Sequence, residues 1–128
     1  MYYLTKATVM GDKALTACAS GYHMASIVEL SDLSHLHYLT TYAGAYQAPG
    51  TDQGDGPPLQ GAGWVRTNNI LGLNNCMDWT SNSSSSTGTI GYIYGQYDTT
   101  TEQAQVYWIF NATLICNNKF SVWCIENP

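Results

Sequence analysis

Charged side chains are scarce in this sequence, and positive ones above all. Asp, Glu, Lys and Arg make up 10% of the 128 residues, with nine acids against four cations and a formal net charge of −5. The cations are scattered along the chain at Lys6, Lys13, Arg66 and Lys119. They form no basic stripe that would neutralise nucleic-acid phosphates and no polybasic segment that would hold an anionic membrane surface. We therefore expect neither as a partner.

Long apolar runs are also missing. No stretch approaches the about 20 apolar residues that span a bilayer, so the sequence predicts no membrane insertion. Hydrophobic residues nevertheless make up 45% of the chain, too many for a disordered tail. A chain of this length and composition is expected to fold as one domain over residues 1–128, with a core of its own.

Common catalytic and metal motifs are absent as well. The sequence has no Gly-x-Ser-x-Gly elbow, no glycine-rich phosphate loop and no Cys-x-x-Cys pair. His35 and His37 stand two residues apart on an expected helix, so they would point to different faces and would not chelate one ion. The sequence therefore favours a protein that binds a ligand over an enzyme.

The cysteines form an even set, Cys18, Cys76, Cys116 and Cys124. Four cysteines allow three pairings. In a domain of this size with few charges, two disulfides formed in an oxidising compartment are the favoured interpretation, which predicts a secreted or cell-surface protein. Four buried free thiols in a cytosolic protein are the alternative.

The first part of the chain predicts a strand and a helix. Residues 2–10 alternate and are rich in Tyr, Thr and Val, as expected of a strand. Asp12 is placed to cap a helix over residues 13–20, and Gly21 to end that helix in the left-handed conformation.

The following segments predict a second helix, a long loop and several strands. Ser31 or Asp32 would cap the helix, whose apolar side chains recur at three-residue intervals. These are Leu33, Leu36, Leu39 and Tyr42. Residues 48–58 are too rich in Gly and Pro for a helix or a strand. The strand candidates that follow are residues 63–67, 89–97, 106–116 and 120–125. The order predicts an α+β fold, with two helices packed on a mixed or antiparallel sheet and a long loop region.

Three segments resemble the C-type lectin-like family. Residues 18–27, Cys-Ala-Ser-Gly-Tyr-His-Met-Ala-Ser-Ile, are similar to the end of the family's first helix and the stretch before its second. Residues 63–67, Gly-Trp-Val-Arg-Thr, lie where the family has its central strand with a Trp, and residues 122–126, Val-Trp-Cys-Ile-Glu, resemble its closing strand. The resemblance covers nearly the whole chain and implies the C-type lectin-like fold.

The resemblance also implies a disulfide pairing. Cys18 would bond Cys124 and tie the first helix to the last strand, while Cys76 would bond Cys116 and anchor the long loop region. The chain-entropy model assigns the outer bridge about 4–5 kcal/mol of stability and the inner bridge slightly less. A bond between Cys116 and Cys124, on adjacent strands, is the alternative that the residues leave open.

The family's calcium site is not matched. Sugar-binding members use a Glu-Pro-Asn or Gln-Pro-Asp triplet, and a Trp-Asn-Asp triplet just before the third cysteine. Here residues 111–113 are Asn-Ala-Thr, and no proline occurs between Pro58 and Pro128. Calcium takes about six to eight oxygen ligands, carboxylates among them, so we expect no cofactor at the usual place. Asp52 and Asp55 are the candidate ligands of a relocated calcium ion; the alternative is that they cap turns in their glycine-rich loop.

Tyrosines and amides concentrate in the second half of the chain, where this fold binds ligands. A tyrosine ring stacks on the apolar face of a sugar, and it also gives a protein partner a large contact at small entropic cost. Tyr92 belongs to this cluster. The candidate ligand-binding residues are Asn74, Asn75, Tyr94, Tyr97, Asp98, Tyr107, Asn111 and Asn117. Most tryptophans are expected in the core.

The expected function is extracellular recognition of a glycan or a cell-surface protein through the long loop region, without the usual calcium. A structural or protein-binding module, such as an adhesin, a fibre tip or a self-assembling surface protein, is the alternative. Formation of a homo-oligomer would raise the avidity of weak single sites.

Overall fold

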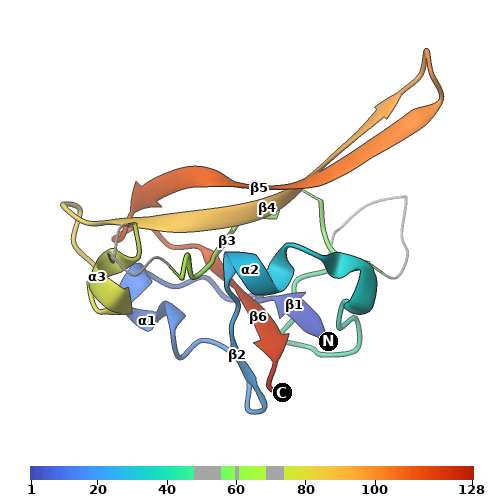
Figure 1. Ribbon diagram of the computed structural model, residues 1–128. Coiled ribbons are helices and arrows are strands. Elements are labelled where there is room, and N and C mark those ends of the chain that lie inside the picture. The colour runs from blue at the N-terminus through green and yellow to red at the C-terminus, as the bar shows by residue number, and fades with distance from the viewer. Residues whose placement is uncertain (48–55, 60, 69–73) are drawn as a thin grey trace.

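The computed structural model describes residues 1–47, 56–59, 61–68 and 74–128 (Figure 1). The candidate calcium ligands Asp52 and Asp55 lie outside these residues. In chain order the elements are β1 (Tyr2–Leu4), α1 (Gly11–Ala14), β2 (Tyr22–Met24), α2 (Ile27–Leu30), the 3₁₀ helix η1 (Leu33–His35), β3 (Gly63–Trp64), α3 (Cys76–Trp79), β4 (Thr87–Asp98), β5 (Gln103–Ile115) and β6 (Ser121–Glu126).

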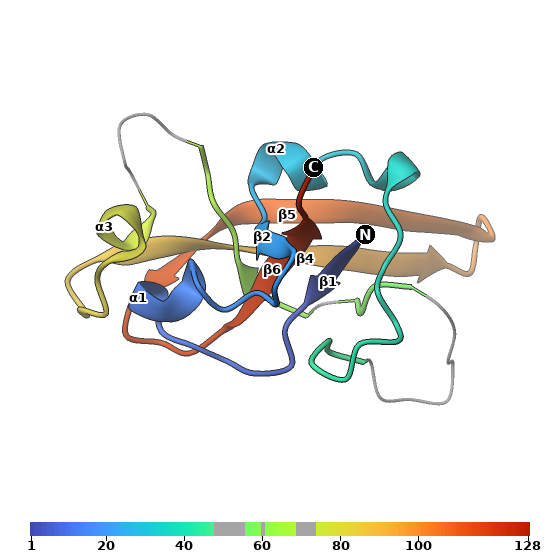
Figure 2. The ribbon, with the colours of Figure 1, turned by 90° about the horizontal axis from the view of Figure 1, so that it is seen from below.

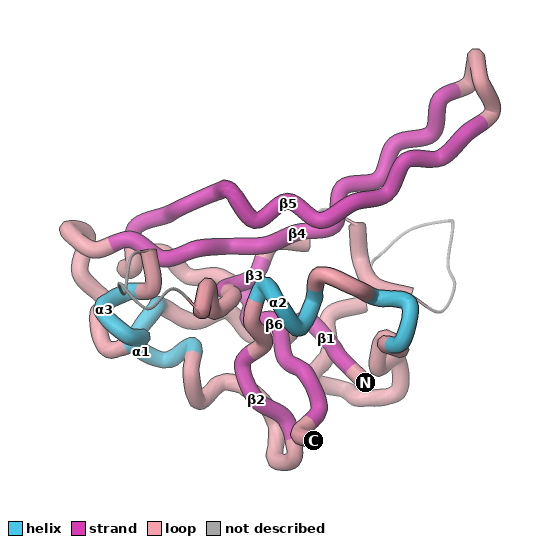
Figure 3. Tube along the Cα trace, in the orientation of Figure 1, coloured by secondary structure: helices cyan, strands magenta, loops and turns pink. Residues whose placement is uncertain are grey.

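The strands form one curled, mixed sheet in the order β1-β6-β3-β4-β5, with β2 also paired to β6. All pairs are antiparallel except β3 with β6, which run parallel. Figure 3 shows β4 and β5 as a long two-stranded hairpin, and Figure 2 shows β6 and β1 crossing beneath it. The predicted α+β class with a mixed sheet is therefore confirmed.

The first predicted helix is much shorter than residues 13–20. The helix α1 ends at Ala14, and its N-cap residue is Met10, with Asp12 in the first turn. Beyond it the backbone N–H of Ala19 donates to the Tyr3 hydroxyl at 2.7 Å, a tertiary bond that takes the place of a helical one. The expected left-handed conformation of Gly21 is confirmed by its φ of +85°.

The second predicted helix is wrong in position and extent. The helix α2 begins at Ile27, where Ser26 and Glu29 form a capping box, and η1 is a separate short turn capped by Asp32. The chain after η1 is extended because it bonds β1: Tyr2 N–H donates to the His37 carbonyl (3.0 Å), and Leu39 N–H donates to the Tyr2 carbonyl (2.8 Å). The leucines at three-residue intervals therefore do not share one helix face.

The strands predicted in the C-terminal part of the chain are confirmed, whereas those predicted nearer the N-terminus are much shorter than expected. The segments predicted as 89–97, 106–116 and 120–125 correspond to β4, β5 and β6. The segments predicted as 2–10 and 63–67 contain only the three-residue β1 and the two-residue β3.

Both disulfides pair as the resemblance implies. Cys18 is bonded to Cys124 and Cys76 to Cys116, each with a Cα–Cα distance of 5.7 Å. The alternative of a bond between the neighbours Cys116 and Cys124 is therefore wrong. The outer bridge ties the segment after α1 to β6, and the inner bridge ties α3 to the end of β5.

The core is built around tryptophans, as predicted. Trp64 and Trp123 are fully buried. The Trp64 indole N–H donates to the Val9 carbonyl at 2.9 Å, and that of Trp123 donates to the Gly91 carbonyl at 2.8 Å, so neither polar group is left unpaired. Among the described residues, no helix has the length and apolar character needed to cross a membrane.

Candidate ligand-binding surface

The β4–β5 hairpin runs across one side of the molecule and projects past it (Figure 1). Its register shifts between Ile90 and Tyr92, which indicates a bulge. At the far end, the Asp98 carboxylate accepts hydrogen bonds from the backbone N–H groups of Thr100 (2.8 Å) and Thr101 (3.4 Å). These bonds lower the pKa of Asp98 below its ordinary value. Asp98 thus shapes the turn of the hairpin.

The two faces of this hairpin differ. Ile93 pairs with Trp108; Ile93 is 1% exposed, and the Trp108 ring lies 4.9 Å from that of Trp123, so this face looks into the core. The alternate pairs, Tyr92 with Ile109 and Tyr94 with Tyr107, therefore face away from the core. We call the four residues Tyr92, Tyr94, Tyr107 and Ile109 the tyrosine face.

The tyrosine face is partly exposed and partly preformed. The rings of Tyr94 and Tyr107 lie 5.3 Å apart at an interplanar angle of 41°, and Tyr107 is 49% exposed. A wide, shallow groove along β5 borders the face; its lining includes Tyr92, Tyr107 and Ile109 from this face and Trp108 and Phe110 from the opposite one. Its breadth suits a ligand that lies along the sheet rather than one enclosed by the protein.

The opposite side of the hairpin supports this face rigidly. Trp108 and Phe110 stack with ring centroids 5.1 Å apart and an interplanar angle of 13°. Phe110 lies so close over Gly91 that a Cβ there would meet its ring at 2.7 Å. The absence of a side chain at Gly91 therefore lets the aromatic pair pack beneath the tyrosines.

The other end of the hairpin adjoins a left-handed turn. Cys76, Met77, Asp78 and Trp79 have φ values of 52°, 51°, 60° and 60°, so α3 is a single turn of left-handed helix. The left-handed conformation costs an L-residue about 1–2 kcal/mol. The Cys76–Cys116 bond, the buried Trp79 ring and a hydrogen bond from Asp78 N–H to the Asn75 side chain (3.0 Å) hold the turn.

A small polar pocket of about 250 Å³ lies between this turn and the end of β3. Arg66, Asn68, Asn75 and Asp78 supply its polar lining. The pocket is a secondary candidate site, because the Arg66 guanidinium and the Asn75 side chain are already engaged by protein groups.

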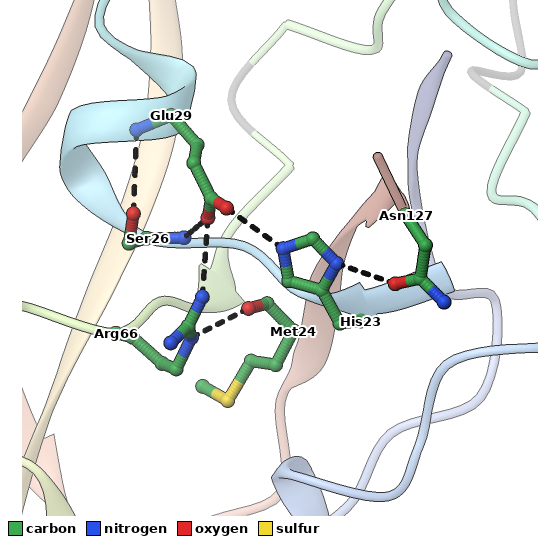
Figure 4. A network of polar contacts seen from close by, with 6 residues as sticks. All are labelled: His23, Met24, Ser26, Glu29, Arg66 and Asn127. Atoms are coloured by element: carbon green, nitrogen blue, oxygen red, sulfur yellow. Dashed lines mark hydrogen bonds and ion pairs between the residues drawn. The ribbon is translucent and has the colours of Figure 1, made fainter. Parts of the chain in front are cut away.

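Arg66 belongs to a polar network centred on Glu29 (Figure 4). The Glu29 carboxylate accepts from Ser26 N–H (2.7 Å) and Arg66 Nη2 (3.2 Å) and contacts His23 Nε2 (2.7 Å). His23 Nδ1 lies 2.7 Å from Asn127 Oδ1, and Arg66 Nε donates to the Met24 carbonyl at 2.7 Å. Burial opposes ionisation of Glu29, but the bonds from His23 and Ser26 outweigh it and lower its pKa. We assign this network a structural role, because its members use one another as partners.

The eight predicted ligand residues are spread along the hairpin. Thr87 at the start of β4 bonds Asn74 (2.8 Å), and Gly88 pairs with Asn75, whereas Asp98 ends the same strand. Asn117 is exposed just after Cys116, at the end near Asn74. Tyr97 and Asn111 belong to β4 and β5, and their side chains lie outside the described part of the structure.

Of the predicted set, Tyr94 and Tyr107 form a direct ring contact. Ile109 is not among the predicted ligand residues, and Tyr92 belongs to the predicted tyrosine cluster without being one of them. The two-residue period of β5 could have linked Ile109 with Tyr107, but their neighbours on β4 depend on a register that the bulge alters.

Within the described ranges, no group of three or more His, Cys, Asp or Glu side chains is arranged to hold a metal ion. Comparison with family models, with curated proteins and with solved structures finds no match to this chain.

Proposed function

We propose that this chain is a divergent C-type lectin-like recognition domain that binds a glycan through its tyrosine face. The observation that carries the proposal is the outward pairing of Tyr94 with Tyr107, beside Tyr92, on the side of the hairpin that faces away from the core. Tyrosine rings offer a sugar an apolar stacking surface at small entropic cost.

The fold assignment is supported by covalent connectivity. One disulfide joins the segment after the first helix to the last strand, and the other joins the region before β4 to the end of β5, the pairing found in the C-type lectin-like family. Two disulfides are typical of proteins that fold in an oxidising compartment, so we assign the domain to the extracellular space or the cell surface.

A protein-binding or self-assembling module is the second candidate. The far end of the hairpin exposes apolar side chains, with Val106 61% and Tyr107 49% exposed. These two side chains point to opposite faces of β5, so a protein partner would reach both of them at the edge of the strand.

A glycan array, run with and without a chelator, tests the leading proposal. We expect binding to at least one class of glycan, unchanged by the chelator. Tyr107→Ala should weaken that binding about tenfold, which corresponds to about 1.4 kcal/mol. Tyr107→Phe should retain most of it, because stacking needs the ring.

Tyr42→Ala is the matched control. Tyr42 is also exposed, and its ring lies 5.2 Å from that of Tyr3, a contact comparable to that of Tyr107 with Tyr94. Equal loss in both variants would refute the tyrosine face as the binding surface. Binding to no glycan class would refute the glycan proposal and favour the protein-binding alternative.

A further inference from the structure

The outer edge of β5 is open within the part of the chain that the structure describes. β5 is the last strand of the sheet, and β4 is its partner. Its distal residues 103–109 pair in unbroken register with Tyr92–Asp98, and Figure 1 shows this end of the hairpin extending beyond the rest of the molecule. Residues 103–107 are all exposed. We call residues 103–109 the arm strand.

The arm strand lacks the features that usually protect a sheet edge. Its sequence, Gln-Ala-Gln-Val-Tyr-Trp-Ile, contains no charged residue and no proline. The bulge of the hairpin lies farther along, opposite the step from Ile90 to Tyr92. Edge strands are ordinarily blocked by Lys, Pro or a bulge, because their free N–H and C=O groups otherwise pair with another strand. A two-stranded ribbon is also only marginally stable by itself.

We propose that the arm strand pairs antiparallel with the arm strand of a second copy of this chain, centred on Val106. Antiparallel pairing of identical strands is two-fold symmetric, so the assembly closes as a dimer. Val106 is the middle residue of the arm strand and is 61% exposed. Its neighbour on β4 is Gly95, which has no side chain to cover it. In the dimer each Val106 lies opposite its symmetry mate, and both are covered.

The distribution of charge also favours a second copy of this chain as the partner, and the antiparallel orientation of the two strands. Each copy carries a net charge of −5, but the arm strand is neutral, so two copies can pair there without opposing like charges across the edge. The acidic residues near the turn, Asp98 and Glu102, are at one end of the arm strand. Antiparallel pairing sends the two acidic turns to opposite ends of the interface, whereas parallel pairing would bring them together.

The dimer joins two hairpins into one four-stranded sheet. The two-fold axis stands perpendicular to this sheet, so the tyrosine faces of both copies lie on the same side. The interface itself uses the strand edge and does not depend on what the tyrosine face binds. The test of the dimer therefore measures the molar mass of the protein in solution and needs no glycan.

Sedimentation equilibrium and light scattering on the full chain provide the test. We expect the wild-type protein to dimerise reversibly with rising concentration. Val106→Lys and Val106→Asp should each raise the dimer dissociation constant at least about tenfold, because each places two like charges directly opposite one another. An equimolar mixture of the two variants should restore dimers, because Lys then lies opposite Asp.

Met77→Lys is the control, since Met77 is 68% exposed on α3, which adjoins the start of β4 at the end of the hairpin opposite the arm strand, and this variant should dimerise like the wild type. Circular dichroism checks that each variant keeps its fold. A wild-type chain that stays monomeric up to its solubility limit overturns the proposal. So does a Val106→Lys dimer of wild-type strength, or a mixture of the two charged variants that fails to associate.

Discussion

Replacing Met77 by glycine should stabilise this protein, although glycine usually destabilises a helical position. Met77 has φ of 51° and ψ of 58°, inside the left-handed turn of α3. That conformation costs an L-residue about 1–2 kcal/mol, whereas glycine adopts it without a steric penalty. Met77 is 68% exposed, so the lost side chain removes little packing.

The expected size follows from two opposing terms. The substitution relieves about 1–2 kcal/mol of backbone strain in the folded protein. Against this, glycine has more conformational freedom in the unfolded chain, and losing that freedom on folding costs about 0.5–1 kcal/mol. The net increase in the free energy of unfolding should be about 0.5–1 kcal/mol. Met77→Ala removes the same side chain but keeps the strained φ, so it should change stability little.

Urea unfolding with both disulfides intact measures the effect. A higher midpoint at unchanged slope reports a change in stability alone. Val28→Gly is the matched control, because Val28 is equally exposed but lies in the right-handed α2, where glycine should destabilise by about 0.5–1 kcal/mol. If Met77→Gly lowers the midpoint as much as Val28→Gly does, α3 holds no left-handed strain and the reasoning is refuted.

Three further outcomes are expected. Replacing both Cys18 and Cys124 by alanine should lower the free energy of unfolding by about 4–5 kcal/mol, because the bond closes a loop with a sequence separation of 106; a loss below about 1 kcal/mol would contradict the chain-entropy account. The pKa of Glu29 is lowered in the folded protein, so the ionised carboxylate stabilises the fold at any pH above the ordinary pKa of 4.5. This stabilisation is lost as the pH falls through the lower pKa of the folded protein. Urea unfolding measured across these pH values should therefore show a smaller loss of stability for Glu29→Gln than for the wild type. Gly91→Ala should destabilise by about 1–3 kcal/mol in thermal unfolding, because its Cβ would meet the Phe110 ring at 2.7 Å; an unchanged midpoint would show that the ring moves freely.

Local patterns were sufficient for several elements. Alternation and β-branched residues located β4, β5 and β6, because a strand with one buried face imposes a two-residue period on its sequence. The conformation of Gly21 was also predictable, since few residues other than glycine adopt a positive φ readily. The Ser26–Glu29 capping box is visible in the sequence as Ser-x-x-Glu, and it marks the start of α2 ahead of the predicted caps Ser31 and Asp32.

The helices show where local reasoning failed. Residues 13–20 and the stretch carrying Leu33, Leu36 and Leu39 have helical spacing, yet both become mostly irregular or extended. Their backbone groups find partners far away in sequence, such as the Tyr3 hydroxyl for Ala19 and the β1 backbone for Leu39. Such long-range hydrogen bonds compete with helix formation and leave no periodic signal.

The candidate site was likewise predictable only in part from the sequence. The enrichment of tyrosine in the second half of the chain indicated the hairpin, but the predicted ligand residues did not form one cluster. Tyr94 contacts Tyr107, whereas Asn74 and Asp98 adjoin opposite ends of β4. Which residues meet depends on strand register, and a bulge at Gly91 shifts that register in a way that composition does not reveal.

The sequence by itself determined the segments of β4, β5 and β6, the tryptophan core and an even set of cysteines, because these follow from side-chain chemistry and short-range periodicity. Only the tertiary structure decided the extent of the helices, the left-handed turn at Cys76–Trp79 and the pairing that gathers the tyrosine face. These features depend on contacts between distant residues. The stability of such contacts is set by the whole fold and not by the segments that take part in them.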